Sequence, residues 1–127
     1  MLAADEANHA SRALVLMPTT RDAERTAQLV AEGGNAATVC LSVPDLCREL
    51  RAGAGVLVLT DETIANDVTG QMAEAMREQP AWSALPVIVV AREGASESIQ
   101  RLAAETFPGL IVVERPVRTR TLLSLIH

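Results

Sequence analysis

The chain has 127 residues and a formal net charge of −5, and 49% of its residues are hydrophobic while only 2% are aromatic. A chain of this size forms one domain that can bury a core without disulfide bonds or a structural metal. Its negative charge and few aromatic rings argue against a nucleic-acid partner. No apolar run is long enough to cross a bilayer, so we expect no membrane contact by this domain.

The N-terminal residues 1–11 are rich in alanine and include Asp5 and Glu6. They lack the basic and apolar regions of a signal peptide, so we expect a disordered N-terminal segment and a cytoplasmic protein. Residues 12–127 then form the folded domain. Cys40 and Cys47 match no common metal or redox motif, which favours two buried thiols in a reducing compartment.

Five short apolar runs predict five strands. Most are continuously apolar, which is typical of parallel strands that are covered by helices on both faces. The predicted strands are residues 13–17, 36–41, 55–59, 86–91 and 110–113.

Helical patterns lie between and after these runs. Thr19 and Thr20 are candidate N-caps of the first helix, and Gly33 and Gly34 end it. Gly70 weakens the middle of the third helix, and the last helix is short, as if truncated. The predicted helices are residues 20–32, 44–51, 64–79, 95–106 and 117–127.

The alternation of five strands and five helices predicts an α/β fold with a doubly wound parallel sheet. The flavodoxin-like strand order 2-1-3-4-5 is the leading topology for five strands.

Common catalytic motifs are absent from the sequence. Gly53 and Gly55 precede a predicted strand, whereas a dinucleotide-binding loop follows one, and the chain has no lysine for a phosphate-binding loop. His9 and His127 lie at the two ends of the chain, away from any predicted site. We therefore expect no catalytic residues and no resident cofactor or metal.

The carboxyl ends of the predicted strands are the place to look for a site, because ligands bind there in parallel α/β sheets. The polar and special residues at these ends are Pro18, Thr19, Thr60, Asp61, Ala91, Arg92, Arg115 and Pro116.

From about Arg12 onward, the chain resembles the receiver domain of bacterial two-component response regulators. The most telling segments are LPVIVV at residues 85–90 and VERPV at residues 113–117. In that family the second segment carries a Lys-Pro pair, usually with a cis peptide bond. The resemblance therefore places Arg115 at the lysine position and makes Pro116 a cis-proline candidate.

A working receiver accepts a phosphoryl group on an aspartate at the end of its third strand. It uses Mg²⁺ held partly by two acidic residues after the first strand, a Thr or Ser after the fourth strand, and the lysine. The resemblance places the acidic pair on Pro18 and Thr19, and the hydroxyl position on Ala91. It places the phosphoacceptor on Thr60, with Asp61 one residue beyond.

The resemblance thus implies a pseudo-receiver, in which the fold is retained and the phosphorylation chemistry is lost. The sequence is similar to receiver-like domains at the N-terminus of bacterial hybrid sensor histidine kinases, which implies other kinase domains as partners. A homodimer contact is expected on the face that includes Ile99, Leu102, Leu122 and Ile126. For Ile99 and Leu102, a place in the core is the favoured reading.

Two alternatives remain open. In the first, Asp61 is an atypical phosphoacceptor, Asp22 or Glu62 helps to hold Mg²⁺, and Arg115 neutralises the phosphate. The simpler reading, which we favour, is that Asp61 caps the third helix. In the second, the strand-end crevice binds a small-molecule signal; Trp82 could stack on such a ligand, but a lone Trp more often packs against the core.

Overall fold

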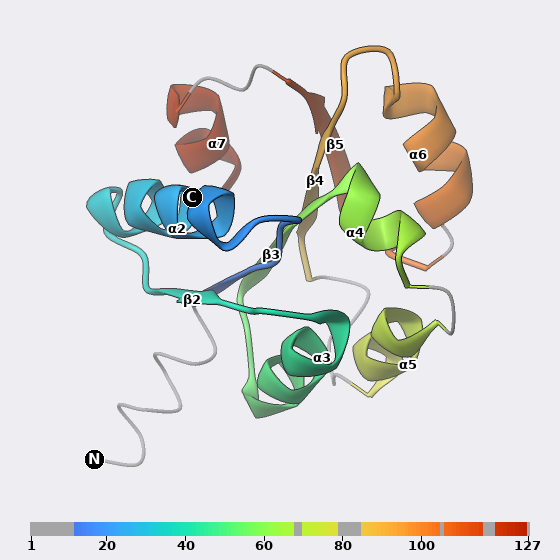
Figure 1. Cartoon of the computed structure of the whole chain (residues 1–127), viewed down its shortest axis with the longest axis horizontal. Coiled ribbons are helices and arrows are strands. Elements are labelled where there is room, and N and C mark those ends of the chain that lie inside the picture. The colour runs from blue at the N-terminus through green and yellow to red at the C-terminus, as the bar shows by residue number, and fades with distance from the viewer. Residues whose placement is uncertain (1–11, 68–69, 79–84, 105, 116–118, 127) are drawn as a thin grey trace.

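The computed structural model describes residues 12–67, 70–78, 85–104, 106–115 and 119–126. Its centre is a five-stranded parallel sheet in the order β2-β1-β3-β4-β5, with helices on both faces (Figure 1). The predicted fold and strand order are confirmed. The expectations for residues 1–11, Trp82 and Pro116 fall outside the described residues.

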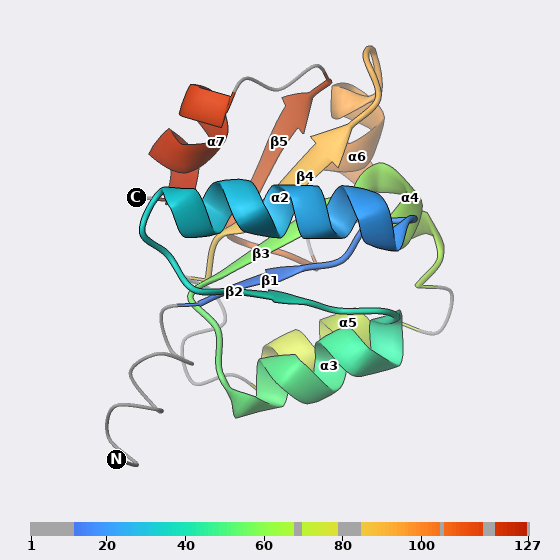
Figure 2. The ribbon, with the colours of Figure 1, turned by 60° about the vertical axis from the view of Figure 1, so that its left-hand side comes forward.

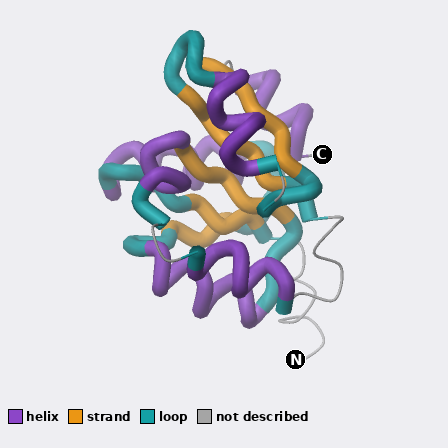
Figure 3. Tube along the Cα trace, turned by 90° about the vertical axis from the view of Figure 1, so that its right-hand side faces the viewer, coloured by secondary structure: helices purple, strands orange, loops and turns teal. Residues whose placement is uncertain are grey.

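The strands are short and mostly buried. They lie side by side in the middle of the molecule, where Figure 3 shows them in orange. Their bounds are β1 Ala13–Val15, β2 Ala37–Val39, β3 Val56–Thr60, β4 Val87–Ala91 and β5 Leu110–Glu114.

The helices form two layers around the sheet. Figure 2 shows α2 on one side of the sheet and α3 and α5 on the other. Side chains of α2 and α7 pack on the first face, and side chains of α3, α5 and α6 pack on the second. The helix bounds are α2 Thr20–Glu32, α3 Val43–Ala52, α4 Asp61–Ala65, α5 Gln71–Arg77, α6 Ser96–Ala103 and α7 Thr119–Ile126.

The first helix begins and ends where the sequence predicts. The Thr19 side chain accepts a hydrogen bond from the Asp22 backbone N–H, which satisfies one of the free donors at the start of α2. The helix ends at Gly33. It begins at Thr20, shortly after β1, so its N-terminal end lies at the carboxyl edge of the sheet.

The predicted helix at residues 64–79 is wrong, because the structure has two shorter helices there. Gly70 has a φ of 71°, a left-handed conformation that interrupts a helix. Both carboxylate oxygens of Asp67 accept backbone hydrogen bonds at the start of α5, from Gln71 and Met72. The first piece, α4, begins at Asp61, three residues before the predicted start.

Leu102 does not lie in the core as favoured from the sequence, because its side chain is 63% exposed. The buried stripe of α6 runs through Ile99 and Ala103, four residues apart, which turns Leu102 away from the sheet. Ile99 and Leu122 are buried, and Ile126 packs partly buried beside Leu122.

Arg12 is a buried charge at the opposite, amino edge of the sheet. Its guanidinium donates hydrogen bonds to the carbonyl oxygens of Gly53 and Glu49 and to the Thr38 hydroxyl, and it pairs with the Glu49 carboxylate at 3.0 Å. These contacts join β1 to α3 and to the loop before β3.

Both cysteines are buried free thiols, as predicted. Burial, together with the nearby carboxylates of Asp45 and Glu49, raises the pKa of Cys40 to about 12. Within the described ranges, none of the helices is long and apolar enough to cross a membrane.

Candidate functional site

The candidate site lies at the carboxyl edge of the sheet, where the ends of the central strands meet. Thr60 at the end of β3 pairs with Val90 of β4, and Val90 in turn pairs with Val113 of β5. This register brings the residues that follow the three strands to the same level. Arg115 is fixed there as well, because its backbone N–H donates to the Ala91 carbonyl oxygen across 2.8 Å.

Thr60 turns the chain from β3 into α4. Its hydroxyl accepts a hydrogen bond from the Thr63 backbone N–H, and the Thr63 hydroxyl accepts one from the Thr60 backbone N–H. This reciprocal pair is a capping box. The expectation that Asp61 caps this helix is therefore wrong: Thr60 is the cap, and Asp61 is the first helical residue.

Asp61 is buried, with only 5% of its area exposed. Its Oδ2 accepts a hydrogen bond from Arg92 Nε across 2.9 Å and a longer one from the Arg92 backbone N–H across 3.4 Å. Adjacent residues at the end of a strand point in different directions. The one-residue offset from Thr60 therefore brings the carboxylate to the connection between β4 and α6.

Arg115 links Asp61 to a second carboxylate. Its Nη2 lies 3.6 Å from Asp61 Oδ1 and 3.1 Å from Glu62 Oε2. We call Asp61, Glu62, Arg92 and Arg115 the strand-end charge cluster. Two carboxylates and two guanidinium groups balance one another in it.

The charge cluster keeps Asp61 ionised. Burial would raise the pKa of the Asp61 carboxyl, but the hydrogen bonds from Arg92, an interaction with Glu62 and the charge of Arg115 outweigh burial and lower it. Within the described part of the chain, Asp61 Oδ1 accepts no hydrogen bond, although it is buried. The positive charge of Arg115 compensates the buried negative charge on this oxygen.

The sequence pattern assigns no role to Arg92. The signal was its position, because it directly follows Ala91 at the carboxyl end of the fourth strand. Its partner lies 31 residues away, so no local pattern identifies the pair.

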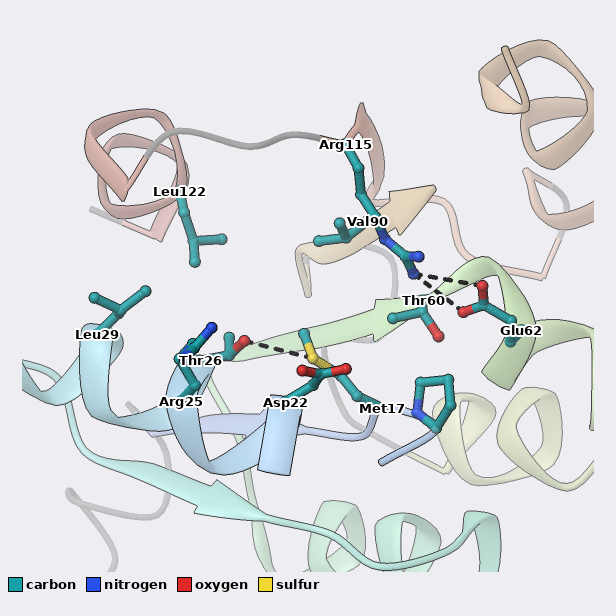
Figure 4. Close-up of a pocket in the computed structure, with 11 residues that line it drawn as sticks. Met17, Asp22, Arg25, Thr26, Leu29, Thr60, Glu62, Val90, Arg115 and Leu122 are labelled. Carbon is teal, nitrogen blue, oxygen red and sulfur yellow. Dashed lines mark hydrogen bonds and ion pairs between the residues drawn. The ribbon is translucent and has the colours of Figure 1, made fainter. Parts of the chain in front are cut away.

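A solvent-open cavity of about 570 Å³ lies beside the charge cluster, between α2 and α7 (Figure 4). Three of the predicted site residues line it: Pro18, Thr60 and Arg115. Thr19 and Ala91 do not line it, since the Thr19 side chain caps α2 and Ala91 is fully buried. The other lining residues are Met17, Asp22, Arg25, Thr26, Leu29, Glu62, Val90 and Leu122.

The acidic residues named for the Mg²⁺ alternative lie on different elements. Asp22 is exposed on α2, and Glu62 on α4 pairs with Arg115. Among the described residues, no three side chains of His, Cys, Asp or Glu type gather closely enough to hold a metal ion. The expectation that the domain holds no metal stays a prediction.

Comparison with known proteins identifies the fold. The structure is similar to that of a CheY-like response regulator receiver domain protein from Methanospirillum hungatei, with a TM-score of 0.73 and 17% sequence identity over 92% of this chain and 90% of that chain. A response regulator receiver domain protein from Clostridium thermocellum has a TM-score of 0.74 and 16% identity, with 91% of this chain and 90% of that chain covered.

A third similar structure is a response regulator protein from Burkholderia multivorans. It has a TM-score of 0.63 and 16% identity over 91% of each chain. No family model and no curated protein matches the sequence. The chain therefore has the CheY-like receiver fold, and identities at this level establish the fold alone.

Proposed function

We propose that this chain is a non-catalytic receiver-like signalling module. It acts through contacts with other domains of a bacterial two-component sensor kinase, and not by phosphorylation of an aspartate. The observation that carries the proposal is the position of Asp61, whose carboxylate is buried and held by Arg92 and Arg115.

An aspartyl nucleophile must reach a phosphodonor and a metal ion. Asp61 does not line the cavity, and its Oδ2 is occupied by Arg92. The residue that does line the cavity at the end of β3 is Thr60, whose hydroxyl is neutral and engaged in the capping box. This arrangement supports a role for Asp61 in fixing the strand ends.

The other positions of the receiver site support the same proposal. Pro18 and Thr19 supply no carboxylate for a metal ion after β1. Ala91 has no hydroxyl to bind a phosphoryl oxygen, and Arg115 is engaged with Asp61 and Glu62.

The alternative of an atypical phosphoacceptor has one observation in its favour. Asp61 Oδ1 accepts no hydrogen bond from the described residues, so it is the oxygen that could attack a phosphoryl group. In this alternative, Arg115 would neutralise the transferred group, and Asp22 or Glu62 would help to hold Mg²⁺.

Intact-mass measurement separates the two functions. The chain is incubated with Mg²⁺ and acetyl phosphate, in parallel with Asp61→Asn. The proposal predicts that neither protein gains the mass of a phosphoryl group. An adduct on the unaltered chain that disappears in Asp61→Asn would establish the phosphoacceptor instead.

Homodimerisation through the face of α6, β5 and α7 is part of the proposal. Ile99 and Leu122 are buried within the protomer, so they contribute to its core. Leu102 is the large apolar side chain that α6 exposes, and it is the residue to test. Sedimentation velocity should give a dimer that dissociates in Leu102→Gln, and a strictly monomeric chain would refute this part of the proposal.

A further inference from the structure

The cavity between α2 and α7 is large enough for a small molecule. Its volume of about 570 Å³ falls within the range of roughly 300 to 1,000 Å³ that is typical of ligand pockets. The cavity also lies at the strand ends, where doubly wound sheets bind ligands.

One end of the cavity is apolar. Leu29 on α2 and Leu122 on α7 lie across from each other there (Figure 4). Met17 and Val90 add apolar surface nearer to Thr60 and Arg115. Filling this end with apolar atoms would remove hydrocarbon surface from water. The ligand therefore needs an apolar body.

The charges that line the cavity come in opposite pairs. Glu62 and Arg115 form an ion pair with each other. Asp22 and Arg25 lie three residues apart on α2. Neither side chain forms an ion pair with any residue in the described ranges. One carboxylate and one guanidinium thus remain available to a ligand.

We propose that this cavity binds a small zwitterion with an apolar body, the class to which hydrophobic α-amino acids belong. The ligand ammonium pairs with Asp22 and its carboxylate with Arg25, which can bind a carboxylate through two parallel hydrogen bonds. The apolar body lies between Leu29 and Leu122.

The chemistry of the lining disfavours simple anions. A phosphate would pair with Arg25 but would face the carboxylate of Asp22 and leave the apolar end empty. The chain also has no lysine. This ligand site is independent of phosphorylation, so it stands or falls separately from the proposed function.

Amide chemical shifts of the ¹⁵N-labelled 127-residue chain provide the test. L-phenylalanine and L-leucine should each cause saturable shifts around Met17, Leu29, Thr60 and Leu122. L-phenylalaninamide lacks the carboxylate and N-acetyl-L-phenylalanine lacks the ammonium group. Each should bind roughly tenfold more weakly, because one charged hydrogen-bond partner is lost.

Two variants assign the two charged groups. Arg25→Gln should weaken L-phenylalanine about tenfold without affecting L-phenylalaninamide, because the amide has no carboxylate to lose. Asp22→Asn should weaken L-phenylalanine without affecting the N-acetyl compound. Arg21→Gln is the matched control, since Arg21 is exposed on α2 outside the lining, and it should change none of the affinities.

Three results would overturn the proposal. The first is the absence of saturable shifts with either amino acid at millimolar concentrations. The second is equal affinity for L-phenylalanine and its two blocked derivatives. The third is binding that Arg25→Gln and Asp22→Asn leave unchanged. Asp22 and Arg25 are exposed, so we expect both variants to fold. The amide spectrum of each variant shows directly whether it has folded.

Discussion

Arg92 Nε donates a hydrogen bond to Asp61 Oδ2 across 2.9 Å, and this bond joins the first residue of α4 to the residue that follows β4. A second bond lies close by, from the Ser96 backbone N–H at the start of α6 to Glu114 Oε2 at the end of β5. The connection between β4 and α6 is thus attached on both sides. The Asp61 carboxylate thus has a structural partner at the carboxyl edge of the sheet.

Replacing Asp61 by Asn should destabilise the domain. The substitution removes the negative charge between Arg92 and Arg115 and brings amide donors toward guanidinium donors. We expect a loss of about 1 to 2 kcal/mol in the free energy of unfolding, measured by urea denaturation at pH 7. Glu93→Gln, on an exposed loop, is the control and should stay within roughly 0.5 kcal/mol of the unaltered chain.

Acidification should remove the stabilisation that the ionised Asp61 carboxylate gives to the fold. The pKa of Asp61 is lower in the folded state than in the unfolded chain, where an Asp titrates near roughly 3.9. Its stabilising effect is therefore fully present above that value and is lost as the pH falls through the folded-state pKa. Urea unfolding at stepwise lower pH should show the difference between the chain and Asp61→Asn shrinking below about pH 4. A difference that grows on acidification would show that the sign of the pKa shift is wrong.

Thr60→Val tests the capping box. Valine keeps the β-branched shape that suits β3, but it cannot accept the hydrogen bond from the Thr63 backbone N–H. We expect the free energy of unfolding to fall by about 1 kcal/mol. Thr121→Val, which removes an exposed hydroxyl from α7, serves as the matched control. Equal effects of the two substitutions would refute a capping role for Thr60.

Arg12→Met should be the most destabilising of these substitutions. It removes a buried guanidinium and leaves backbone carbonyl oxygens and the Glu49 carboxylate without their donor. A loss of roughly 3 kcal/mol is expected from thermal or urea unfolding. Arg48→Met, which removes an arginine that is 74% exposed and ion-paired on the same helix as Glu49, should cost less than about 1 kcal/mol.

The layers of the fold could be predicted from the sequence because their determinants are local. Continuous apolar runs indicate parallel strands that are buried on both faces, and Thr19 and Gly33 mark the ends of α2. The split between α4 and α5 does not follow from the apolar spacing, in which Gly70 is only a weak point within one helix. The side chain of Asp67 starts a new helix there instead.

The candidate site was only partly predictable. Parallel strands place Pro18, Thr60 and Arg115 at one edge, and the structure brings all three to one cavity. The bond between Asp61 and Arg92 depends on the register between β3 and β4 and on where α4 begins. Neither follows from a local sequence pattern, which predicts Asp61 as a cap and assigns no role to Arg92.

We propose that Asp61 is a fixed ion-pair partner and not a phosphoryl acceptor. The most direct test is an equilibrium measurement of the ¹⁵Nε signals of Arg92 and Arg115 while Mg²⁺ and beryllofluoride, a phosphoryl analogue, are added. We expect both signals to stay unchanged, with Arg92 still bonded to Asp61. Saturable shifts of both signals that require Mg²⁺ and vanish in Asp61→Asn would contradict it.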